Sequence, residues 1–199
     1  MKILDEKQDV LLKRAVRGDE QAFLALYQKH QAALYRYALR MTGSPWAAEE
    51  VVQEVFLVLI REPEKYQVAR GELGAFLYGV ARNRVMKHLE RLPRESSLDV
   101  TTADGSVWHE PADPLTPMMI AEKRERIDQV REAVLSLPAE FREAVVLCEL
   151  EEMSYEEAAN SCGCPIGTIR SRLHRGRALL LAKLELLRDT PRRASAGRK

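Results

Sequence analysis

Residues 153–177 read MSYEEAANSCGCPIGTIRSRLHRGR, and this stretch predicts two short helices joined by a tight turn. Ser154 and Glu157 have the spacing of a capping box, in which the hydroxyl and the carboxylate each bond a backbone N–H at the start of a helix. Gly163 permits the sharp turn, and Pro165 suits the first position of the next helix, where its missing N–H costs nothing. The order helix, turn, helix is that of a helix-turn-helix motif.

The second helix of this motif has an apolar side and a basic side. Four apolar residues recur at helical spacing and predict a buried stripe: Ile166, Ile169, Leu173 and Leu180. No acidic residue occurs between Pro165 and Leu184. This is the pattern of a recognition helix that enters the major groove of DNA, although an ordinary solvated helix face can also be basic.

Position on this helix assigns different roles to its polar side chains. Three residues share the side opposite the apolar stripe and are candidates to contact base edges: Ser171, His174 and Arg175. Three others flank that side and are candidates for phosphate contacts, which give affinity and register: Arg170, Arg172 and Arg177. Thr168, near the start of the helix, is placed to offer its backbone N–H to a phosphate.

The composition of the whole chain is that of an ordinary folded protein. It has 199 residues, of which 46% are hydrophobic and 31% are charged, enough apolar material for one ordinary domain or two small ones. The formal net charge is only +1. Any argument for nucleic-acid binding therefore rests on local basic surfaces and not on the total charge.

Several classes of protein are disfavoured by the sequence. No apolar run approaches the roughly 20 residues that span a bilayer, and the first residues lack the apolar core of a signal peptide. Three cysteines cannot all pair, which favours reduced thiols and a cytoplasmic location, and the spacing of Cys162 and Cys164 is poor for a metal site. Because no Ser/His/Asp set, phosphate loop or metal cluster is evident, we expect neither an enzyme nor a cofactor.

Helical periodicity through the first 93 residues predicts four helices. Asp19 is a suitable N-cap for the second helix, Gly43 ends it, and Ser44-Pro45 supplies the cap and the first residue of the third. The third helix has a buried side and an exposed, mainly acidic strip: Glu49, Glu50, Gln53, Glu54 and Leu57. Acids in a first helical turn also complement the helix dipole, so this strip has a purely structural interpretation as well.

The fourth helix, from about residue 72 to 91, follows a polar loop that holds Lys65, Tyr66 and Arg70. Its apolar residues, Phe76 among them, define an inward side. The outward side carries a different set: Arg82, Asn83, Arg84, Lys87, His88 and Arg91. Cations for phosphates and rings for unstacked bases are what the binding of single-stranded nucleic acid requires, although a solvated basic face shares this pattern.

Periodicity disappears over residues 94–117, where Ser, Thr, Asp, Gly and Pro accumulate and five acids accompany one arginine. Such a stretch buries too little apolar surface to offset the entropy of ordering, so we expect a flexible linker. Helical patterns resume after Pro117 and end near Leu187, before a basic tail. The sequence therefore predicts an all-α protein of two small helical domains joined by a flexible acidic linker, the C-terminal domain containing the helix-turn-helix.

Three stretches and the helix-turn-helix, in this order, resemble the extracytoplasmic-function (ECF) type of bacterial RNA polymerase sigma factor. AEEVVQEVF (48–56) resembles the helix that docks on the clamp of core polymerase, and RGELGAFLYGVARN (70–83) resembles the loop and helix that melt and read the minus-ten element. LPAEFREAV (137–145) resembles the start of the domain that reads the minus-thirty-five element. The resemblance implies four segments: 1–93 as sigma region 2, 94–117 as linker, 118–188 as sigma region 4 and 189–199 as basic tail.

The resemblance also implies partners and residue roles. The partners would be core RNA polymerase, through its clamp and flap, promoter DNA and an anti-sigma factor, with no insertion into a membrane. The acidic strip would bind core polymerase, and the recognition-helix residues named above, from Thr168 to Arg177, would read the minus-thirty-five element. The residues for the minus-ten element would be Lys65, Tyr66, Arg70, Phe76, Arg82, Asn83 and Lys87. Phe76 stands where the family often has tryptophan, and Lys87 where it often has aspartate.

Two other classes of function remain open at this point. A repressor or activator would use residues 1–93 for dimerisation or effector binding and would bind palindromic duplex DNA unaided, with half-sites about one turn apart. A helical adaptor with incidental basic faces would bind no specific DNA. Binding to core polymerase and selection of asymmetric promoters would distinguish a sigma factor from both.

Overall fold

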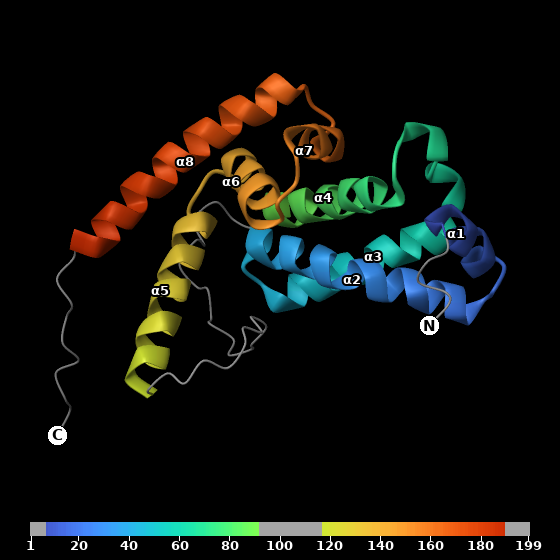
Figure 1. Ribbon diagram of the computed structural model, residues 1–199, viewed down its shortest axis with the longest axis horizontal. Helices are drawn as coiled ribbons and strands as arrows, with labels where there is room; N and C mark the ends of the chain where they lie inside the picture. The colour runs from blue at the N-terminus through green and yellow to red at the C-terminus, as the bar shows by residue number, and fades with distance from the viewer. Residues whose placement is uncertain (1–6, 92–116, 190–199) are drawn as a thin grey trace.

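The computed structural model describes residues 7–91 and 117–189, and within these ranges the chain is helical and without β-strands (Figure 1). The helices are α1 (Gln8–Val16), α2 (Glu20–Thr42), α3 (Pro45–Arg61), α4 (Leu73–Arg91), α5 (Pro117–Leu135), α6 (Ala139–Val145), α7 (Tyr155–Cys162) and α8 (Ile166–Asp189). Short helical turns are η1 (Pro63–Lys65), η2 (Val68–Arg70) and η3 (Val146–Leu150). The all-α prediction is confirmed. The predicted linker, apart from Pro117, and the predicted tail, apart from Asp189, lie outside the described residues.

In the N-terminal bundle, α1 to α4, the caps of α2 and α3 and the end of α2 stand where the sequence predicts them. Asp19 Oδ1 accepts hydrogen bonds from the N–H groups of Gln21 and Ala22, each at 3.1 Å, and so caps α2. Gly43 ends α2 in the left-handed conformation with φ 71°, and Ser44 Oγ accepts from the Ala47 N–H at 3.3 Å to cap α3. These local signals fix the two tight connections around which the bundle folds.

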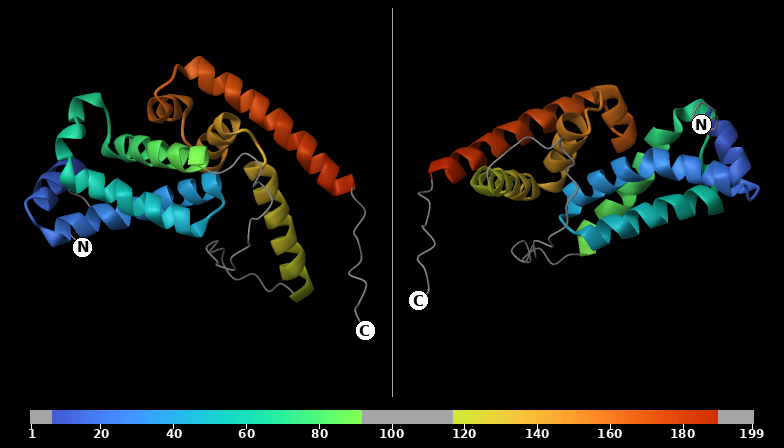
Figure 2. Two further views of the ribbon diagram at one scale, coloured as in Figure 1. Left: turned by 180° about the vertical axis from the view of Figure 1, so that it is seen from behind. Right: turned by 60° about the horizontal axis from the view of Figure 1, so that its bottom comes forward.

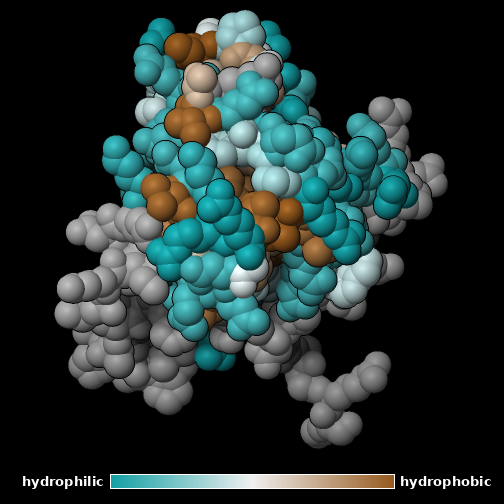
Figure 3. Space-filling model, turned by 90° about the vertical axis from the view of Figure 1, so that its right-hand side faces the viewer, coloured by the Kyte–Doolittle hydropathy of each residue, from teal (hydrophilic) through white to brown (hydrophobic). Residues whose placement is uncertain are grey.

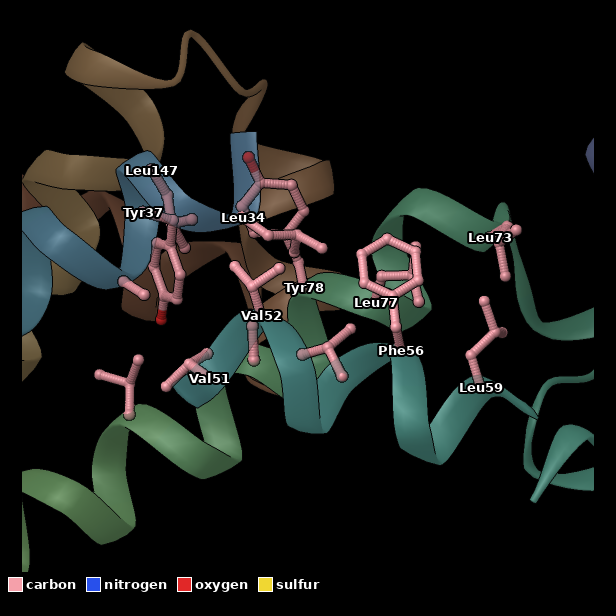
Figure 4. Close-up of a cluster of buried hydrophobic side chains, with 14 of the residues drawn as sticks. Leu34, Tyr37, Val51, Val52, Phe56, Leu59, Leu73, Leu77, Tyr78 and Leu147 are labelled. Carbon is pink, nitrogen blue, oxygen red and sulfur yellow. The ribbon is translucent and has the colours of Figure 1, made fainter. Parts of the chain in front are cut away.

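The core of this bundle is a row of apolar side chains between α2, α3 and α4 (Figure 4). The predicted inward residues of α3 are all buried: Val51, Val52, Val55, Phe56 and Leu59. Tyr27 and Phe56 pack with their ring centroids 4.8 Å apart, and Phe23 meets Phe56 edge to face. Leu147, from the C-terminal half of the chain, lies at one end of the row near Tyr37, so the core does not stop at the bundle.

The exposed end of the bundle mixes hydrophilic and apolar side chains (Figure 3). Its surface is mostly hydrophilic, with apolar side chains gathered in a few patches. At this end of the bundle, Val68 of η2 is 59% exposed. The bundle therefore presents a mixed contact surface and not a purely charged one.

The C-terminal unit, α5 to α8, contains the helix-turn-helix. The capping box is present, because Ser154 Oγ accepts from the Glu157 N–H at 3.2 Å and Glu157 Oε2 accepts from the Ser154 N–H at 2.8 Å. Gly163 ends α7 with φ 62°. Ile169 and Leu173 of α8 are buried, but Ile166 is 36% exposed, because it occupies the first position of α8, ahead of the turns that pack on α6 and α7.

Gly176 marks the closest approach of α8 to α6, which the sequence reading missed. A Cβ atom on Gly176 would lie 2.8 Å from Val145 Cγ2 and 3.1 Å from the Phe141 carbonyl oxygen. Such distances are shorter than van der Waals contact, so only glycine lets the two helix backbones pack this closely. Gly176 thus determines how closely the recognition helix α8 packs against α6.

A π-helical turn, η3, follows α6 directly, where the sequence suggests one continuous helix. Its closing bond runs from the Glu151 N–H to the Val146 carbonyl oxygen, five residues back, at 2.9 Å. Each such turn carries one residue more than an α-helical turn. The extra residue turns Leu147 into the core and brings Glu151 against the N-terminal bundle.

The two halves of the described chain pack against each other (Figures 1 and 2). α6 and α7 lie over α2 and α4, while α5 and α8 extend beyond the bundle. Residues of the C-terminal unit belong to the same buried cluster as the bundle core: Val134, Val146, Leu147, Ala158, Ala159, Cys162 and Ile169. Two sigma-type helical units were predicted, and the structure adds that they dock. None of the helices in 7–91 and 117–189 has the length and apolar character needed to cross a bilayer.

His30 gives the bundle a pH-dependent stability. Its Nε2 lies 2.7 Å from Gln8 Oε1, and burial, together with Lys29, lowers the His30 pKa from 6.5 to about 4. The unfolded chain therefore binds this proton more readily, so the stabilisation is complete above pH 6.5 and is lost as pH falls toward 4. Between pH 7 and pH 5 we expect His30 to contribute a loss of about 1 kcal/mol, discounted for partial exposure, or roughly 2–4 °C in Tm.

The measurement compares thermal unfolding of the wild type and His30→Gln at both pH values. Glutamine keeps a donor for Gln8 but cannot titrate, so the variant should show a smaller drop in Tm than the wild type. Equal drops in the two proteins would show that other groups account for the acid sensitivity.

Candidate nucleic-acid and polymerase interface

The residues predicted to contact base edges are solvent-exposed on the outward side of α8. Ser171, His174 and Arg175 are exposed. His174 and Arg175 make no ion pair or side-chain hydrogen bond with any residue in the described ranges. The Ser171 hydroxyl donates to the Thr168 carbonyl oxygen at 2.9 Å, which leaves its lone pairs available. Two donors are therefore free to reach base edges without first breaking a contact within the chain.

The three flanking arginines are each held by a neighbour. The Arg170 guanidinium lies 5.7 Å from the centre of the Tyr155 ring, and Arg172 lies 3.9 Å from Glu140 and is half-buried. Arg177 donates to Glu149, and this hydrogen bond raises the Arg177 pKa. These contacts orient the three side chains, and their role in binding phosphates stays a prediction.

The exposed strip of α3 is present but its members are not equivalent. Glu49, Glu50, Gln53 and Leu57 are exposed, with Leu57 at 47%. Glu54 is half-buried and accepts from Arg84 Nε of α4 at 3.0 Å. Glu54 thus also ties α3 to α4, which is a structural role different from the helix-dipole role considered from the sequence, whereas Glu50 has no ion pair within the described residues.

The loop before α4 places two aromatic rings together. Tyr66 and Phe76 are half-buried, with ring centroids 5.6 Å apart, and burial raises the Tyr66 pKa. Lys65 is exposed and pairs with Glu62. The backbone of Arg70 belongs to η2, but its side chain lies outside the described part of the molecule. The rings at the start of α4 are in contact at a tilt of 51°, and they do not form separate exposed platforms.

The predicted outward residues of α4 separate into two groups. Arg84 and His88 are half-buried, whereas Asn83, Lys87 and Arg91 are exposed, as expected. Arg82 is not: its side chain is 27% exposed, and its Nε donates to Glu143 Oε1 of α6 at 2.7 Å. The expectation that Arg82 faces solvent is wrong, because the C-terminal unit packs on this side of α4. A cleft of about 340 Å³ beside it is lined by Arg82 from the bundle and Arg172 from α8, among others.

Polar side chains buried between the two halves were missed by the sequence reading. Glu143 is 1% exposed and also accepts from the Tyr37 hydroxyl at 3.1 Å. The Glu151 side chain is 3% exposed and pairs with Arg36 at 3.3 Å and with Arg40. One signal was available for Glu143, since it precedes Val146 and Leu147 by three and four residues and so shares their buried face.

The three cysteines, Cys148, Cys162 and Cys164, are free thiols. Burial raises the pKa of Cys162 to about 12. Among the residues that the structure describes, no cluster of three or more His, Cys, Asp or Glu side chains could hold a metal ion. Cys162 therefore behaves as a small buried residue of the helix-turn-helix and not as a reactive thiolate at neutral pH.

Comparisons with known proteins match both halves of this arrangement. Residues 26–95 match Sigma-70 region 2, and residues 127–180 match Sigma-70, region 4. The chain is 31% identical to the RNA polymerase sigma-H factor of Pseudomonas aeruginosa, over 94% of this chain and 99% of that one. It is 33% identical to the ECF RNA polymerase sigma factor SigE of Mycolicibacterium smegmatis, over 82% of this chain but only 63% of that longer relative.

A solved structure agrees with these sequence relationships. The sigma factor RpoE of Bartonella quintana, solved in complex with the anti-sigma factor NepR, superposes with a TM-score of 0.61 and 27% identity, covering 82% of this chain and 97% of that one. Members of the sigma family are transcription initiation factors and not enzymes. The chain belongs to the extracytoplasmic-function family of RNA polymerase sigma factors.

Proposed function

We propose that the chain binds core RNA polymerase, directs it to asymmetric promoters and helps to melt their minus-ten element. The observation that carries the proposal is the exposed side of α8, where Arg175 and His174 have no partner in the described chain, in a helix-turn-helix that follows a region 2 unit. A helix of this kind reads base edges in the major groove. It would anchor the upstream element while the bundle engages the downstream one.

The bundle would use one surface to bind polymerase and another to bind DNA. The exposed acidic strip of α3 would contact the polymerase clamp, with Leu57 supplying an apolar contact among the charges. Asn83 and Lys87 of α4, with the Tyr66 and Phe76 rings at its start, would engage the non-template strand. Flipping out one base costs a few kcal/mol, which stacking and pocket contacts offset.

Control by an anti-sigma factor is part of the proposal. The Bartonella quintana relative was solved in complex with such a factor. A partner of this kind would act in the cytoplasm, where core polymerase is found, by covering surfaces that polymerase or promoter DNA otherwise occupy.

The direct test is run-off transcription with purified core polymerase on a promoter library. A sigma factor should give transcripts from asymmetric promoters that share two spaced elements, and it should co-elute with core polymerase. A repressor or activator should instead bind palindromic duplex DNA as a dimer without polymerase. Absence of both the transcripts and the co-elution would rule out the proposal.

Arg175→Ala and Arg170→Ala should weaken DNA binding in different ways. Removal of Arg175 should cost about 1–3 kcal/mol on the preferred upstream element and relax base preference there. Removal of Arg170 should weaken binding to all sequences alike and reduce the slope of log affinity against log salt by about 1. Fluorescence anisotropy with holoenzyme and substituted promoters measures both effects, and identical behaviour of the two variants would refute the assignment of faces.

Glu50→Lys should weaken binding to core polymerase without changing the fold. Glu50 is exposed and has no ion pair in the described chain, unlike Glu54, so its reversal does not disturb the packing of α3 on α4. We expect roughly tenfold weaker binding, the equivalent of about 1.4 kcal/mol. The matched control is Glu90→Lys, at an exposed position near the end of α4. Equal affinities of Glu50→Lys and this control for core polymerase would leave the strip with a structural role only.

A further inference from the structure

Glu143 has its charge compensated almost entirely by the other half of the molecule. Its carboxylate is 1% exposed, and both donors to its Oε1, the Arg82 guanidinium and the Tyr37 hydroxyl, come from the N-terminal bundle. Its Oε2 is buried without a hydrogen-bond partner. A buried carboxylate is stable only with its cation in place, so this arrangement depends on Arg82 staying where it is.

Glu151 repeats the arrangement one π-turn further along the chain. It receives Arg36 and Arg40 of α2, and Arg40 also donates to the Leu150 carbonyl oxygen at 2.8 Å. The side chain of Glu151 is 3% exposed, and this burial raises its pKa in spite of the two arginines. We call Glu143 and Glu151 the docking carboxylates, because every arginine that pairs with them in the described chain belongs to the N-terminal bundle.

The charges on the two docked surfaces are complementary. The bundle contributes the cations Arg36, Arg40 and Arg82, and the C-terminal unit contributes the two docking carboxylates. Buried apolar contact accompanies this pairing, since Ala158 and Ala159 of α7 belong to the same buried cluster as Leu77 of α4. The interface therefore combines apolar packing with a specific charge pattern, which an incidental contact lacks.

The pairing uses a residue that DNA would otherwise bind. The Arg82 guanidinium has its Nε on Glu143 Oε1 at 2.7 Å, whereas its neighbours Asn83 and Lys87 remain exposed. A phosphate group offers the same negative charge and acceptor geometry as the Glu143 carboxylate. While the two halves are docked, the Arg82 Nε–H is bonded to Glu143 and the side chain is only 27% exposed, so a phosphate has to displace Glu143 to take this hydrogen bond.

We propose that the docking carboxylates hold the chain in a closed form in which Glu143 occupies Arg82 in place of single-stranded DNA. The inference rests on the proposed function only for the role of Arg82, since docking itself is independent of transcription. Opening of the closed form exposes Arg82, and the apparent affinity for DNA is the intrinsic affinity scaled by the open fraction. The C-terminal unit is thus an internal competitor of the strand that the bundle binds.

The test uses the full chain and the variant Glu143→Lys, which faces Arg82 with a like charge. Small-angle X-ray scattering reports whether the halves separate, and circular dichroism reports whether the helices remain. The matched control is Glu132→Lys, which makes the same charge change in the same unit at an exposed residue of α5 that has no ion pair within the described ranges. Glu151→Lys is a second, independent way to open the interface.

DNA binding is measured with a fluorescent, mixed-sequence, single-stranded 20-nucleotide probe. We expect a larger radius of gyration for Glu143→Lys and Glu151→Lys but not for Glu132→Lys. We also expect the two opening variants to bind the probe about three- to tenfold more tightly than the control does. Adding Arg82→Gln to Glu143→Lys should remove that gain. This set of results supports the proposal.

Two outcomes overturn it. An unchanged radius of gyration in both opening variants means that the carboxylates do not hold the halves together. An increased radius with a gain in binding that persists without Arg82 means that the closed form covers something else. Failure of the proposed function is separate, because run-off transcription can be absent while the scattering still responds to the docking carboxylates.

Discussion

Replacement of Gly176 with leucine is expected to unfold the C-terminal unit at temperatures where the wild-type chain remains folded. A Cβ at this position already falls 2.8 Å from Val145 Cγ2 and 3.1 Å from the backbone oxygen of Phe141, and backbone cannot step aside as a flexible side chain can. Overpacking of a fitted contact costs about 1–3 kcal/mol, and a leucine against helix backbone belongs at the upper end. That corresponds to a Tm lower by roughly 6–12 °C.

Gly167→Ala is the control for this experiment. Gly167 lies in the first turn of the same helix, and a Cβ there would meet nothing within 4 Å. Alanine has the higher helix propensity, so this variant should be unchanged or more stable by up to about 1 kcal/mol. Thermal unfolding followed by circular dichroism measures both variants, and a Gly176→Leu protein as stable as Gly167→Ala would show that α6 and α8 are not packed at this depth.

Arg142→Met is expected to destabilise the chain by about 3 kcal/mol. The Arg142 guanidinium donates to the carbonyl oxygens of Leu135 and Leu137, at the end of α5, and to that of Met41, at the end of α2. Burial lowers the Arg142 pKa, yet the side chain serves two helix C-termini at once. Methionine would keep the apolar contacts but leave three carbonyl groups without this donor. Each carbonyl oxygen that remains buried without a hydrogen bond costs about 1–3 kcal/mol of stability.

The comparison for Arg142→Met is Arg131→Met on α5. Arg131 is half-exposed and pairs with Asp128 three residues before it, an arrangement worth little in water. Its loss should change the free energy of unfolding by less than about 0.5 kcal/mol. Urea unfolding measures both variants, and similar midpoints for the two would contradict the bridging role of Arg142.

The sequence was sufficient for features that depend on neighbours along the chain. The caps at Asp19, Ser44 and Ser154 and the ends at Gly43 and Gly163 are set within four residues, so local spacing predicts them. The basic side of α8 follows from helical periodicity in the same way. The roles of individual site residues in binding polymerase and DNA stay predictions.

The sequence could not predict contacts between residues that are far apart along the chain. Arg82 and Glu143 are 61 residues apart, and Arg40 and Glu151 are 111 apart, so no window of sequence contains either pair. Charged residues on helices are usually exposed, and Arg82 was assigned to solvent for that reason. The sequence does not predict the π-turn, because its residues fit an ordinary helical pattern. Only the backbone hydrogen bonds reveal that this turn contains one additional residue.

The π-turn η3 also bears on how this chain tolerates insertions and deletions. An α-helix advances about 100° per residue, so removal of one residue from 146–150 would restore a regular helix but rotate everything beyond it by that angle relative to α6. Glu143 precedes the turn and Glu151 follows it, so their relative direction depends on its count of residues. Deletion of one residue from this turn would therefore move Glu151 away from Arg36 and Arg40 even if every side chain were kept.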